Sequence, residues 1–406
     1  MSEVIRMPRR TVAVAAAAVA ALAAGTLPAQ AAPAGPGGPK LRLGTVRQAD
    51  NPRDVVRGSY IVTLKSGTKA PSAAGARIAA RYGGRISHTY TRALNGYAVE
   101  LGPVQARRLA ADPAVASVAE DVRLRASATQ TDPVWGLDRI DQPALPLDSR
   151  YTSPNGGGAG VTVYVVDTGV RISHKEFGGR ARNGYDFIGK DKVAQDSNGH
   201  GTHVAATAAG ATYGVAKKAK VVGVRVLNAN GEGTLAQVIA GIDWVTKNAV
   251  KPAVANLSLG GGVSVELDKA VRASIASGVT YTVAAGNEGI PAGALSPSRV
   301  KQAIVVGATN RWDERSYFSN WGPAVDLFAP GEDIRSASHK SDTGTVSFDG
   351  TSMAAPHAAG AAALYLAAHP KATPATVEKG LVGKAAAGQI RDSRIGSPNR
   401  LLQVSP

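Results

Sequence analysis

The feature that most constrains the fold is a series of apolar runs that recurs after residue 125. Runs such as Val161–Val166 and Val254–Leu259 are almost continuously apolar and alternate with stretches of helical period. Strands have this composition when both faces of their sheet are buried, as in parallel sheets covered by helices. The sequence therefore predicts an α/β fold in three layers, with a mainly parallel sheet in the middle. The other expected strands are Val221–Leu227, Val279–Ala284 and Ala303–Val306.

A shorter pattern precedes this region. Its elements follow the order β-α-β-β-α-β, which is the ferredoxin-like arrangement and predicts a small α+β domain at residues 53–127. Residues 32–52 are rich in Pro, Gly and Ala without an apolar period, so we expect a flexible linker there. The expected strands of the small domain are Gly58–Leu64, Arg85–Tyr90, Leu94–Leu101 and Val115–Val122, and its helices are Ser72–Tyr82 and Pro103–Ala111.

The N-terminus has the pattern of an export signal. Arg6, Arg9 and Arg10 precede an apolar run from Thr11 to Ala24, and small residues around Ala31 follow. A membrane-spanning helix needs roughly 20 apolar residues, which is more than this run supplies. We therefore predict a cleavable signal peptide at residues 1–31 and an extracellular protein. The arginine pair leaves the twin-arginine and the general export routes both open.

Composition excludes several classes of function. The chain has no cysteine, so disulfides, thiolate metal sites and a cysteine nucleophile are ruled out. The net charge of +16 is divided as +2 on residues 1–32, +9 on residues 33–127 and +5 on the remainder. Because most of the excess precedes the predicted α/β region and no basic stripe contains aromatics, we expect no nucleic acid partner. We also expect no membrane partner, and a monomer.

The first candidate for chemistry is Asp167, which directly follows the apolar run Val161–Val166. Active sites of parallel sheets lie at the carboxyl ends of the strands, so a carboxylate in this place is a candidate. An Asp followed by Thr168 and Gly169 is also an ordinary turn. Asp167 alone therefore decides nothing.

The second candidate is His200, in the stretch Asn198-Gly199-His200-Gly201-Thr202-His203. Its two flanking glycines indicate a close approach of the backbone, just ahead of a helical run rich in alanine. His200 could serve as a general base. The alternatives are a metal pair with His203 or a capped helix start. A zinc site on a helix usually has histidines four residues apart with a Glu, which is absent here.

The third candidate is Ser352, in the stretch Gly350-Thr351-Ser352-Met353-Ala354 at the start of a long helix of small residues. Free amides and the helix dipole favour negative charge at this position. A serine becomes a nucleophile when an adjacent base takes its proton and a carboxylate orients that base. Ser352 could also be a simple N-cap.

The order Asp, His, Ser is that of subtilisin. On five motifs in this order, the chain resembles the subtilases, and within them the proteinase K and aqualysin branch, from about residue 55 to the end. The motifs are Val166-Asp167-Thr168-Gly169-Val170, the His200 stretch, Ser258-Leu259-Gly260-Gly261, Ala284-Ala285-Gly286-Asn287-Glu288 and the Ser352 stretch.

The resemblance implies a subtilisin-like fold and a serine endopeptidase with Asp167, His200 and Ser352 as its catalytic triad. It implies that the Asn287 side chain and the Ser352 backbone N–H form the oxyanion hole. Two backbone segments, Gly231-Glu232-Gly233 and Ser258-Leu259-Gly260, correspond to those that hold an extended peptide between them in this family.

The resemblance also indicates the substrate preference. Ala284, Ala285, Gly286 and Gly260 would line a roomy, apolar pocket for the residue before the scissile bond. No acidic residue is expected to point into it. We therefore predict cleavage after aromatic or aliphatic residues in protein and peptide substrates, and not after Lys or Arg.

Residues 53–127 resemble the inhibitor-like propeptide of the family. The resemblance implies a precursor whose propeptide assists folding, inhibits the enzyme intramolecularly and is cleaved off autocatalytically. Large parallel sheets fold slowly through non-local contacts, which is a physical reason for such assistance. We place the cut near Ser127–Ala128, so that the catalytic domain comprises residues 128–406.

Calcium as a structural cofactor is implied by the resemblance alone. Asp326 corresponds to a ligand carboxylate of the branch, with the main-chain carbonyls of Lys301 and Ala303 as further ligands. Asp326 could equally be a structural residue at a strand end. The chain departs from many relatives in the branch because it has no cysteine near the catalytic histidine, where Val204 follows His203.

Two other classes of function remain as alternatives. One is a secreted binding protein that keeps the fold without turnover. The other is a hydrolase of small esters. The complete triad with Asn287 argues against the first, and the two peptide-binding segments argue against the second.

Overall fold

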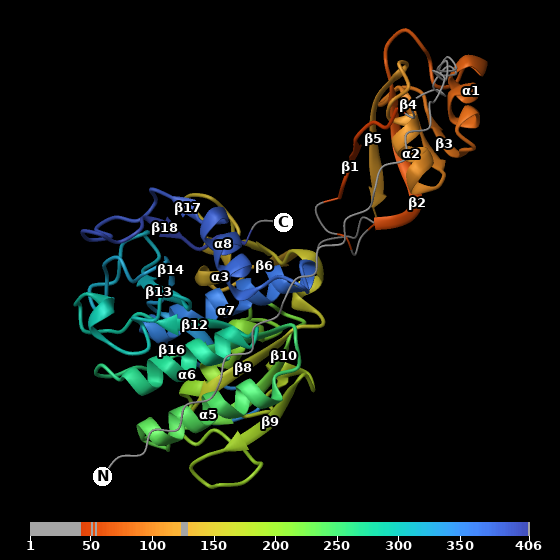
Figure 1. Cartoon of the computed structure of the whole chain (residues 1–406). Helices are drawn as coiled ribbons and strands as arrows, with labels where there is room; N and C mark the ends of the chain where they lie inside the picture. The colour runs from red at the N-terminus through yellow and green to blue at the C-terminus, as the bar shows by residue number, and fades with distance from the viewer. Residues whose placement is uncertain (1–41, 50–51, 53–54, 123–128, 405–406) are drawn as a thin grey trace, which may run out of the picture.

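A computed structural model describes residues 42–49, 52, 55–122 and 129–404. The predicted signal peptide and the predicted cut near Ser127–Ala128 lie outside these residues. The described residues form a small N-terminal unit, orange in Figure 1, and a large unit coloured from yellow to blue. In the described part of the chain, no helix has both the length and the apolar character needed to cross a membrane.

From Val55 to Val122 the small unit has the predicted β-α-β-β-α-β order. Ser72 caps the first helix by accepting a hydrogen bond from Gly75 N, and Pro103 begins the second helix. Its five-stranded sheet has the order β1-β5-β2-β4-β3 and buries one apolar core against both helices. The elements are β1 Val46–Arg47, β2 Val55–Leu64, α1 Ala73–Arg81, β3 Arg85–Tyr90, β4 Gly96–Glu100, α2 Pro103–Leu109 and β5 Val115–Val122.

The predicted linker at residues 32–52 is wrong at β1, which pairs in parallel with β5 at the edge of the small sheet. Nearby, Gly44 N donates a hydrogen bond to Arg107 O at 2.7 Å, and Val46 packs against the small core. An open strand edge offers unpaired backbone groups, and this segment satisfies some of them. A strand of two residues is too short to show a hydrophobic period, so the sequence pattern of this segment, rich in Pro and Gly, gave no indication of it.

The large unit contains a nine-stranded sheet of order β17-β18-β14-β13-β12-β11-β8-β10-β9. All neighbouring pairs are parallel except β17 with β18. The mainly parallel sheet predicted from the apolar runs is therefore confirmed. Its strands are β8 Thr162–Asp167, β9 Ala181–Asp186, β10 Lys220–Arg225, β11 Ala253–Leu257, β12 Thr280–Ala284, β13 Ile304–Thr309, β14 Leu327–Pro330, β17 Ala386–Ala387 and β18 Arg400–Leu401.

Helices cover both faces of this sheet and give the three expected layers. Along β8, Val163 and Val165 contribute to the core that contains α4 and α7, whereas Tyr164 and Val166 contribute to the core that contains α5 and α6. This alternation explains why the strand is apolar throughout. The helices are α3 Trp135–Ile140, α4 His200–Ala209, α5 Leu235–Asn248, α6 Val265–Ala276, α7 Thr351–Ala368 and α8 Pro374–Lys384.

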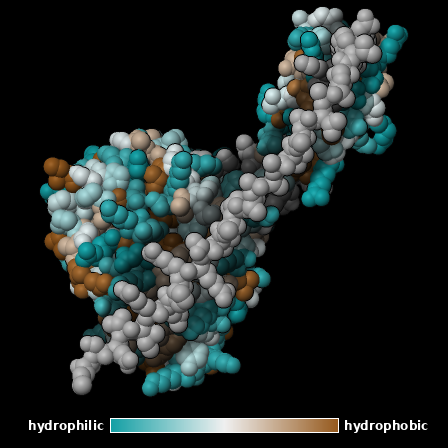
Figure 2. Space-filling model, viewed as in Figure 1, coloured by the Kyte–Doolittle hydropathy of each residue, from teal (hydrophilic) through white to brown (hydrophobic). Residues whose placement is uncertain are grey.

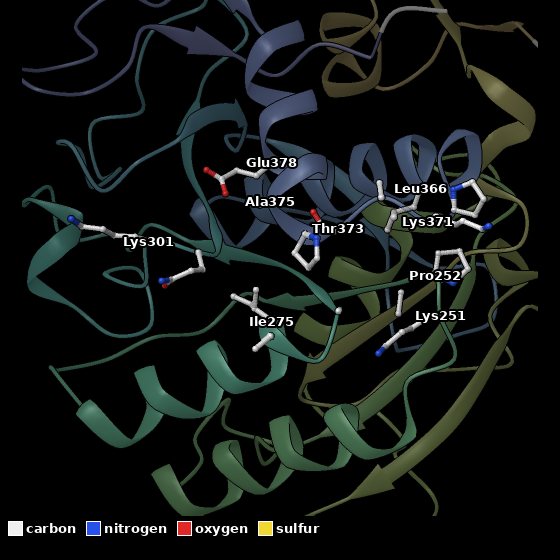
Figure 3. A pocket seen from close by; sticks show the side chains of 16 residues that line it. Lys251, Pro252, Ile275, Lys301, Leu366, Lys371, Thr373, Ala375 and Glu378 are labelled. Atoms are coloured by element: carbon white, nitrogen blue, oxygen red, sulfur yellow. The ribbon is translucent and has the colours of Figure 1, made fainter. Parts of the chain in front are cut away.

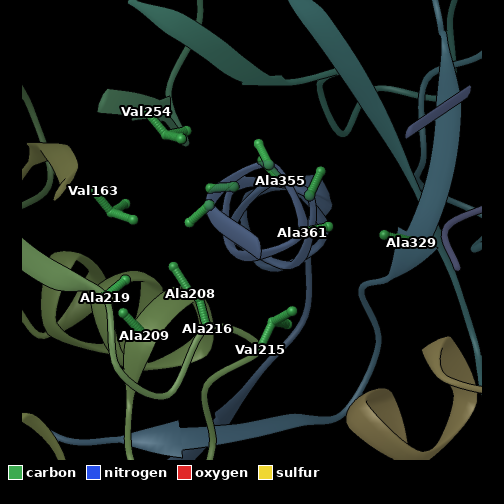
Figure 4. Close-up of a cluster of buried hydrophobic side chains, with 14 of the residues drawn as sticks. Val163, Ala208, Ala209, Val215, Ala216, Ala219, Val254, Ala329, Ala355 and Ala361 are labelled. Carbon is green, nitrogen blue, oxygen red and sulfur yellow. The ribbon is translucent and has the colours of Figure 1, made fainter. Parts of the chain in front are cut away.

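Helix α7 runs through the interior of the large unit and is built almost entirely from small residues. Figure 4 looks along it and shows Ala355 and Ala361 on its surface, surrounded by side chains from other elements. A Cβ atom at Gly360 would lie 2.5 Å from Val215 Cβ, so the neighbouring chain packs against bare backbone there. Close packing of this kind fixes the start of α7, where Ser352 lies.

The remaining elements are short. One of them, a hairpin of β15 and β16, leads directly into α7. On the face drawn in Figure 2, hydrophilic residues dominate the surface and hydrophobic ones form small groups. These elements are β6 Thr129–Thr131, β7 Arg150–Thr152, β15 Ile334–Ala337 and β16 Thr345–Phe348, and the short helices Asn155–Gly158, Lys175–Phe177 and Ala292–Ala294.

Candidate active site

The candidate residues meet at the carboxyl edge of the large sheet. Asp167 is the last residue of β8, which lies between β10 and β11. Asn256 of β11 pairs with Val165 of β8, and Ser258, two residues further on, therefore follows β11 at the same edge of the sheet as Asp167. Neighbouring strands are about 4.8 Å apart. The fold thus brings Asp167 and the segment that starts at Ser258 together, as the strand-end argument predicts.

Asp167 and His200 form a hydrogen-bonded pair. His200 Nδ1 lies 2.8 Å from Asp167 Oδ1, and the same oxygen accepts a hydrogen bond from Thr168 N at 2.7 Å. Asp167 is fully buried, whereas a quarter of the His200 side chain is exposed. Because a carboxylate only accepts, Nδ1 carries the proton and Nε2 keeps its lone pair. The free lone pair is the one that a general base needs.

The charges around His200 increase its basicity. Burial lowers the pKa of His200, but the charge of Asp167, its hydrogen bond and the charge of Asp196 together raise it above the usual value. The nearby carboxylates therefore stabilise the protonated imidazole more than burial destabilises it.

Glycines shape the loop that carries His200. Gly199 has a φ of +114°, a conformation that L side chains rarely adopt. A Cβ atom at Gly201 would lie 2.1 Å from Gly169 O. The two glycines that flank His200 are therefore required, one by its dihedral angle and the other by close packing against the end of β8.

Ser352 is the second residue of α7, and its hydroxyl points at the segment after β11. Ser352 Oγ donates to Ser258 O at 3.1 Å, and Ser258 Oγ donates to Ser352 O at 2.7 Å. Among the described residues, no hydrogen bond joins Ser352 Oγ to His200. Catalytic hydrogen bonds are often absent or long without substrate. The hydroxyl has to rotate away from Ser258 O to reach the imidazole.

Asn287 lies next to Ser352 with its amide orientation fixed. Its Oδ1 accepts hydrogen bonds from Thr351 N at 2.8 Å and Thr351 Oγ1 at 2.9 Å. Since the backbone N–H can only donate, the atom facing Thr351 is the oxygen, and Nδ2 faces the other way. A Cβ atom at Gly350 would lie 3.5 Å from Asn287 Nδ2 and 3.6 Å from Ser352 N. The two donors that the predicted oxyanion hole needs therefore both lie near Gly350.

Asn320 supports this loop and was missed by the sequence analysis. Its Nδ2 donates to Ala285 O at 3.0 Å and to Glu288 Oε2 at 2.8 Å, and its backbone N donates to Gly286 O at 3.0 Å. Gly286 has a φ of +103°, and a Cβ atom there would lie 2.2 Å from Asn320 Nδ2. The motif Phe318-Ser319-Asn320-Trp321-Gly322 was the signal that could have indicated a supporting role.

The predicted peptide-binding segments lie on both sides of Asp167. Gly231-Glu232-Gly233 is exposed in the loop after β10, and Gly260 is exposed after β11. Leu259, between Ser258 and Gly260, is half-buried. Because β10 and β11 are the two neighbours of β8, a chain that passes Asp167 has an accessible backbone segment on either side.

The structure adds two observations on the predicted specificity pocket, the burial of Ala285 and the position of Glu288. The side chain of Ala285 is fully buried among Val305 and Phe328, so it cannot line a pocket. An acidic group does lie nearby, since a Cβ atom at Gly286 would lie 2.7 Å from Glu288 Oε2. Side chains alternate across a strand end, which sends Ala284 and Ala285 to opposite sides.

The predicted calcium ligands lie at other parts of the sheet. Asp326 Oδ2 accepts a hydrogen bond from Val305 N at 2.8 Å. Burial raises the pKa of Asp326 to about 7, although the Val305 N–H lowers it, and the charge of Glu378 raises it further. Ala303 is buried two residues before Val305. Lys301 and Glu378 border a cavity of about 600 Å³ at the amino-terminal ends of β11, β12 and β13 (Figure 3).

The alternative of a metal pair at His200 and His203 has little support from the geometry. His203 is buried and its Nε2 donates to Ile334 O at 2.7 Å. Burial lowers the pKa of His203 to about 3. Throughout the described ranges, no group of three or more His, Asp and Glu side chains could hold a metal ion.

Two family models match the chain. Residues 158–398 match the model described as "Subtilase family". Residues 59–127 match the model described as "Peptidase inhibitor I9".

Individual proteins are also similar. An "Extracellular serine proteinase" of Thermus sp. (strain Rt41A) is 53% identical over 320 residues, which are 79% of this chain and 78% of that protein. An "Alkaline serine exoprotease A" of Vibrio alginolyticus is 49% identical over 332 residues, 80% of this chain and 61% of that protein. A solved structure titled "Crystal structure of a cold adapted subtilisin-like serine proteinase" has 52% identity and a TM-score of 0.66, and the match covers 67% of this chain and 98% of the solved one.

Proposed function

Since the chain belongs to the subtilase family of serine proteases, we propose that it is a secreted endopeptidase, made as a zymogen, with Asp167, His200 and Ser352 as its catalytic triad. The observation that carries the proposal is the site at the carboxyl edge of the sheet. There, the hydrogen-bonded pair of Asp167 and His200 lies at the end of β8, and Ser258, to whose carbonyl oxygen the Ser352 hydroxyl donates, follows the end of the neighbouring strand β11.

The proposed reaction proceeds through an acyl-enzyme. The Ser352 hydroxyl turns from Ser258 O to His200 Nε2, gives up its proton and attacks the carbonyl carbon of the scissile bond. Ser352 N and Asn287 Nδ2 stabilise the negative charge that develops on the carbonyl oxygen. His200 then protonates the leaving amine, and Asp167 stabilises the imidazolium meanwhile. A water molecule, deprotonated by His200, hydrolyses the acyl-enzyme.

The small unit acts in this proposal as an intramolecular inhibitor. The match of residues 59–127 to the inhibitor family supports this role. The cut that releases it lies near Ser127–Ala128, and the cleavage is autocatalytic. An exported precursor of this kind stays inactive until it has left the cell, which agrees with the name of the Thermus relative.

The test of the proposed function is expression of the full chain with assay of the secreted product. We expect hydrolysis of casein and a mature N-terminus at residues 125–128 by mass spectrometry. A folded, exported chain that keeps its N-terminal unit and cleaves neither casein nor small peptide anilides would contradict the proposal.

Preference for an apolar residue before the scissile bond is a further part of the proposal. The preference follows from the resemblance, in which Ala284, Gly286 and Gly260, all without a side chain larger than a methyl group, line the pocket. We expect a tetrapeptide anilide ending in Phe to be cleaved at least ~10-fold faster, in kcat/KM, than the matched Arg anilide. Equal or faster cleavage of the Arg substrate would refute this preference.

Glu288 provides the matched control for that measurement. Its carboxylate lies beside Gly286, where it could attract a cationic side chain, but it accepts a hydrogen bond from Asn320. Glu288→Gln should leave cleavage of the Phe substrate unchanged and lower the residual cleavage of the Arg substrate. A change in the Phe substrate alone would show that Glu288 acts on the loop and not on specificity.

Calcium binding at Asp326, Lys301 and Ala303 is proposed as a structural feature. One carboxylate and two carbonyls are oxygen ligands of the kind that Ca²⁺ prefers, and they would supply part of its usual set of about six to eight. The raised pKa of Asp326, which burial and Glu378 cause, would be relieved by a cation at this point. A bound ion would tie the start of β13 to β14.

Removal of calcium should therefore lower the melting temperature. An ion present at 100 times its dissociation constant stabilises a protein by about 2.7 kcal/mol, which is roughly 5 °C or more for a domain of this size. Calorimetry with and without chelator measures the shift, and Asp326→Asn should move the calcium dependence to higher concentration. A melting temperature unaffected by chelator, or an unchanged titration in Asp326→Asn, would argue against this site.

A further inference from the structure

One buried carboxylate beside the candidate triad has no part in the proposed reaction. Asp196 is only 3% exposed, and it lies in the loop that leads to His200. Burying a carboxylate is costly unless donors or cations compensate its charge. The groups that compensate the charge of Asp196 therefore indicate its role.

Asp196 accepts five hydrogen bonds from residues on both sides of His200. Its Oδ1 accepts from Asn198 N at 2.9 Å, Gly199 N at 2.8 Å and Thr168 Oγ1 at 2.9 Å. Its Oδ2 accepts from Thr202 N at 2.8 Å and Thr202 Oγ1 at 2.5 Å. All five donors lie within the His200 loop or next to Asp167, so the carboxylate joins the two parts of the site.

Thr168 connects this carboxylate to the end of β8. Its hydroxyl donates to Asp196 and accepts a hydrogen bond from Gly201 N at 2.9 Å. Its backbone N donates to Asp167 Oδ1, the oxygen that also binds His200 Nδ1. The residue after Asp167 is thus bonded to the residue after His200, and both depend on Asp196.

Ionisable groups from several elements face His200 or its loop. Arg225 of β10 donates to Ser197 Oγ at 2.8 Å, and its charge is paired with Asp186 at 3.0 Å. Asp167 from β8 and Asp196 both raise its pKa. His203, one turn further along α4, is neutral because burial lowers its pKa to about 3. The ring of His339, from the turn between β15 and β16, lies against Gly199, since a Cβ atom there would come within 2.4 Å of its Nδ1. Asp196 is therefore the second negative charge of the site.

We propose that Asp196 is a positioning residue of this reaction, a second buried carboxylate that holds the glycine loop of His200 against the strand end of Asp167. The inference rests on the proposed function. Without the five bonds, the loop is free to shift, because its glycines restrain it little. The imidazole then loses its alignment with both Asp167 and Ser352.

The experiment is the substitution Asp196→Asn, assayed on the full chain. An amide places an N–H₂ group where two or three N–H and O–H donors now converge, so part of the network is lost. We expect kcat to fall ~10- to 100-fold, because a misplacement of catalytic groups by about 1 Å lowers the rate by up to about that factor. KM should be nearly unchanged. We also expect slower conversion of the precursor.

The pH profile separates positioning and charge from loss of fold. His200 must be neutral to act as base, so activity rises with pH through its pKa. Removing a nearby negative charge lowers that pKa, and the acidic limb of kcat/KM should therefore move to lower pH in Asp196→Asn. Asp268→Asn is the matched control, because Asp268, on α6, is about as buried as Asp196 and pairs with Arg299. It should lower the melting temperature without moving the acidic limb.

A second pair of variants tests the inference even if Asp196→Asn does not fold. Thr168→Val removes the hydroxyl that bonds Asp196 and Gly201, whereas Thr168→Ser keeps it. We expect the valine variant to lose at least ~10-fold in kcat and the serine variant to keep most of its activity. If the wild type is active and Asp196→Asn has the same kcat and the same acidic limb, the inference is overturned. Equal activity of the two Thr168 variants would overturn it as well. An inactive wild type would instead overturn the proposed function.

Discussion

Replacement of Ser352 by alanine is expected to abolish both casein hydrolysis and processing of the precursor. The substitution removes only the hydroxyl at the start of α7 and leaves the buried helix in place. In subtilisin itself, loss of the nucleophile costs about 10⁶-fold in turnover, so no hydrolysis above background should be seen. Casein assays and the mass of the secreted chain measure the two effects.

Ser347→Ala is the matched control for this variant. Ser347 lies on β16, five residues before Ser352, and is exposed. It undergoes the same chemical change in the same segment, and its activity should equal that of the wild type. Hydrolysis or self-processing by a folded Ser352→Ala protein would mean that another residue is the nucleophile.

Replacement of Asp167 by asparagine has the second largest expected effect. One amide oxygen could still accept from Thr168 N and His200 Nδ1, because both bonds now end on the same oxygen. The N–H₂ group would then take the place of Oδ2, which is buried and has no partner in the described structure. The charge that stabilises the imidazolium would be gone.

We therefore expect kcat to fall about 10⁴-fold in Asp167→Asn, the size of loss known for the corresponding change in a serine protease triad. KM should change little, because the peptide-binding segments after β10 and β11 are untouched. Steady-state kinetics on the Phe anilide measures both constants. A loss confined to KM would place Asp167 in substrate binding and not in the triad.

The fold was predictable where the composition of a strand indicates that both of its faces are buried. The runs at Val161–Val166 and Val254–Leu259 predicted β8 and β11, and every residue of these two strands is buried, as in a sheet covered on both faces. The same argument predicted that Asp167 lies at a strand end. The short strand at Val46 was not predictable, because its pairing depends on the exposed edge of β5 and not on its own composition.

The supporting residues of the candidate site were harder to predict. Asn320 and Asp196 act through hydrogen bonds to backbone groups. Almost every residue has the same backbone groups, so the sequence does not show which of them a side chain will bind. The burial of Ala285 and the position of the Glu288 carboxylate could not be predicted, because the direction of a side chain after a strand end depends on local dihedral angles. For example, the φ of +103° at Gly286 turns the chain between them.

The central claim is that Ser352 is activated by the pair of Asp167 and His200. Labelling with a sulfonyl fluoride, followed by mass spectrometry of the peptides, tests it most directly. The account predicts one adduct per chain, located on Ser352, with loss of activity in proportion to labelling and little labelling in His200→Ala. Full hydrolytic activity in a labelled protein, or an adduct on a different residue that accompanies inactivation, would contradict it.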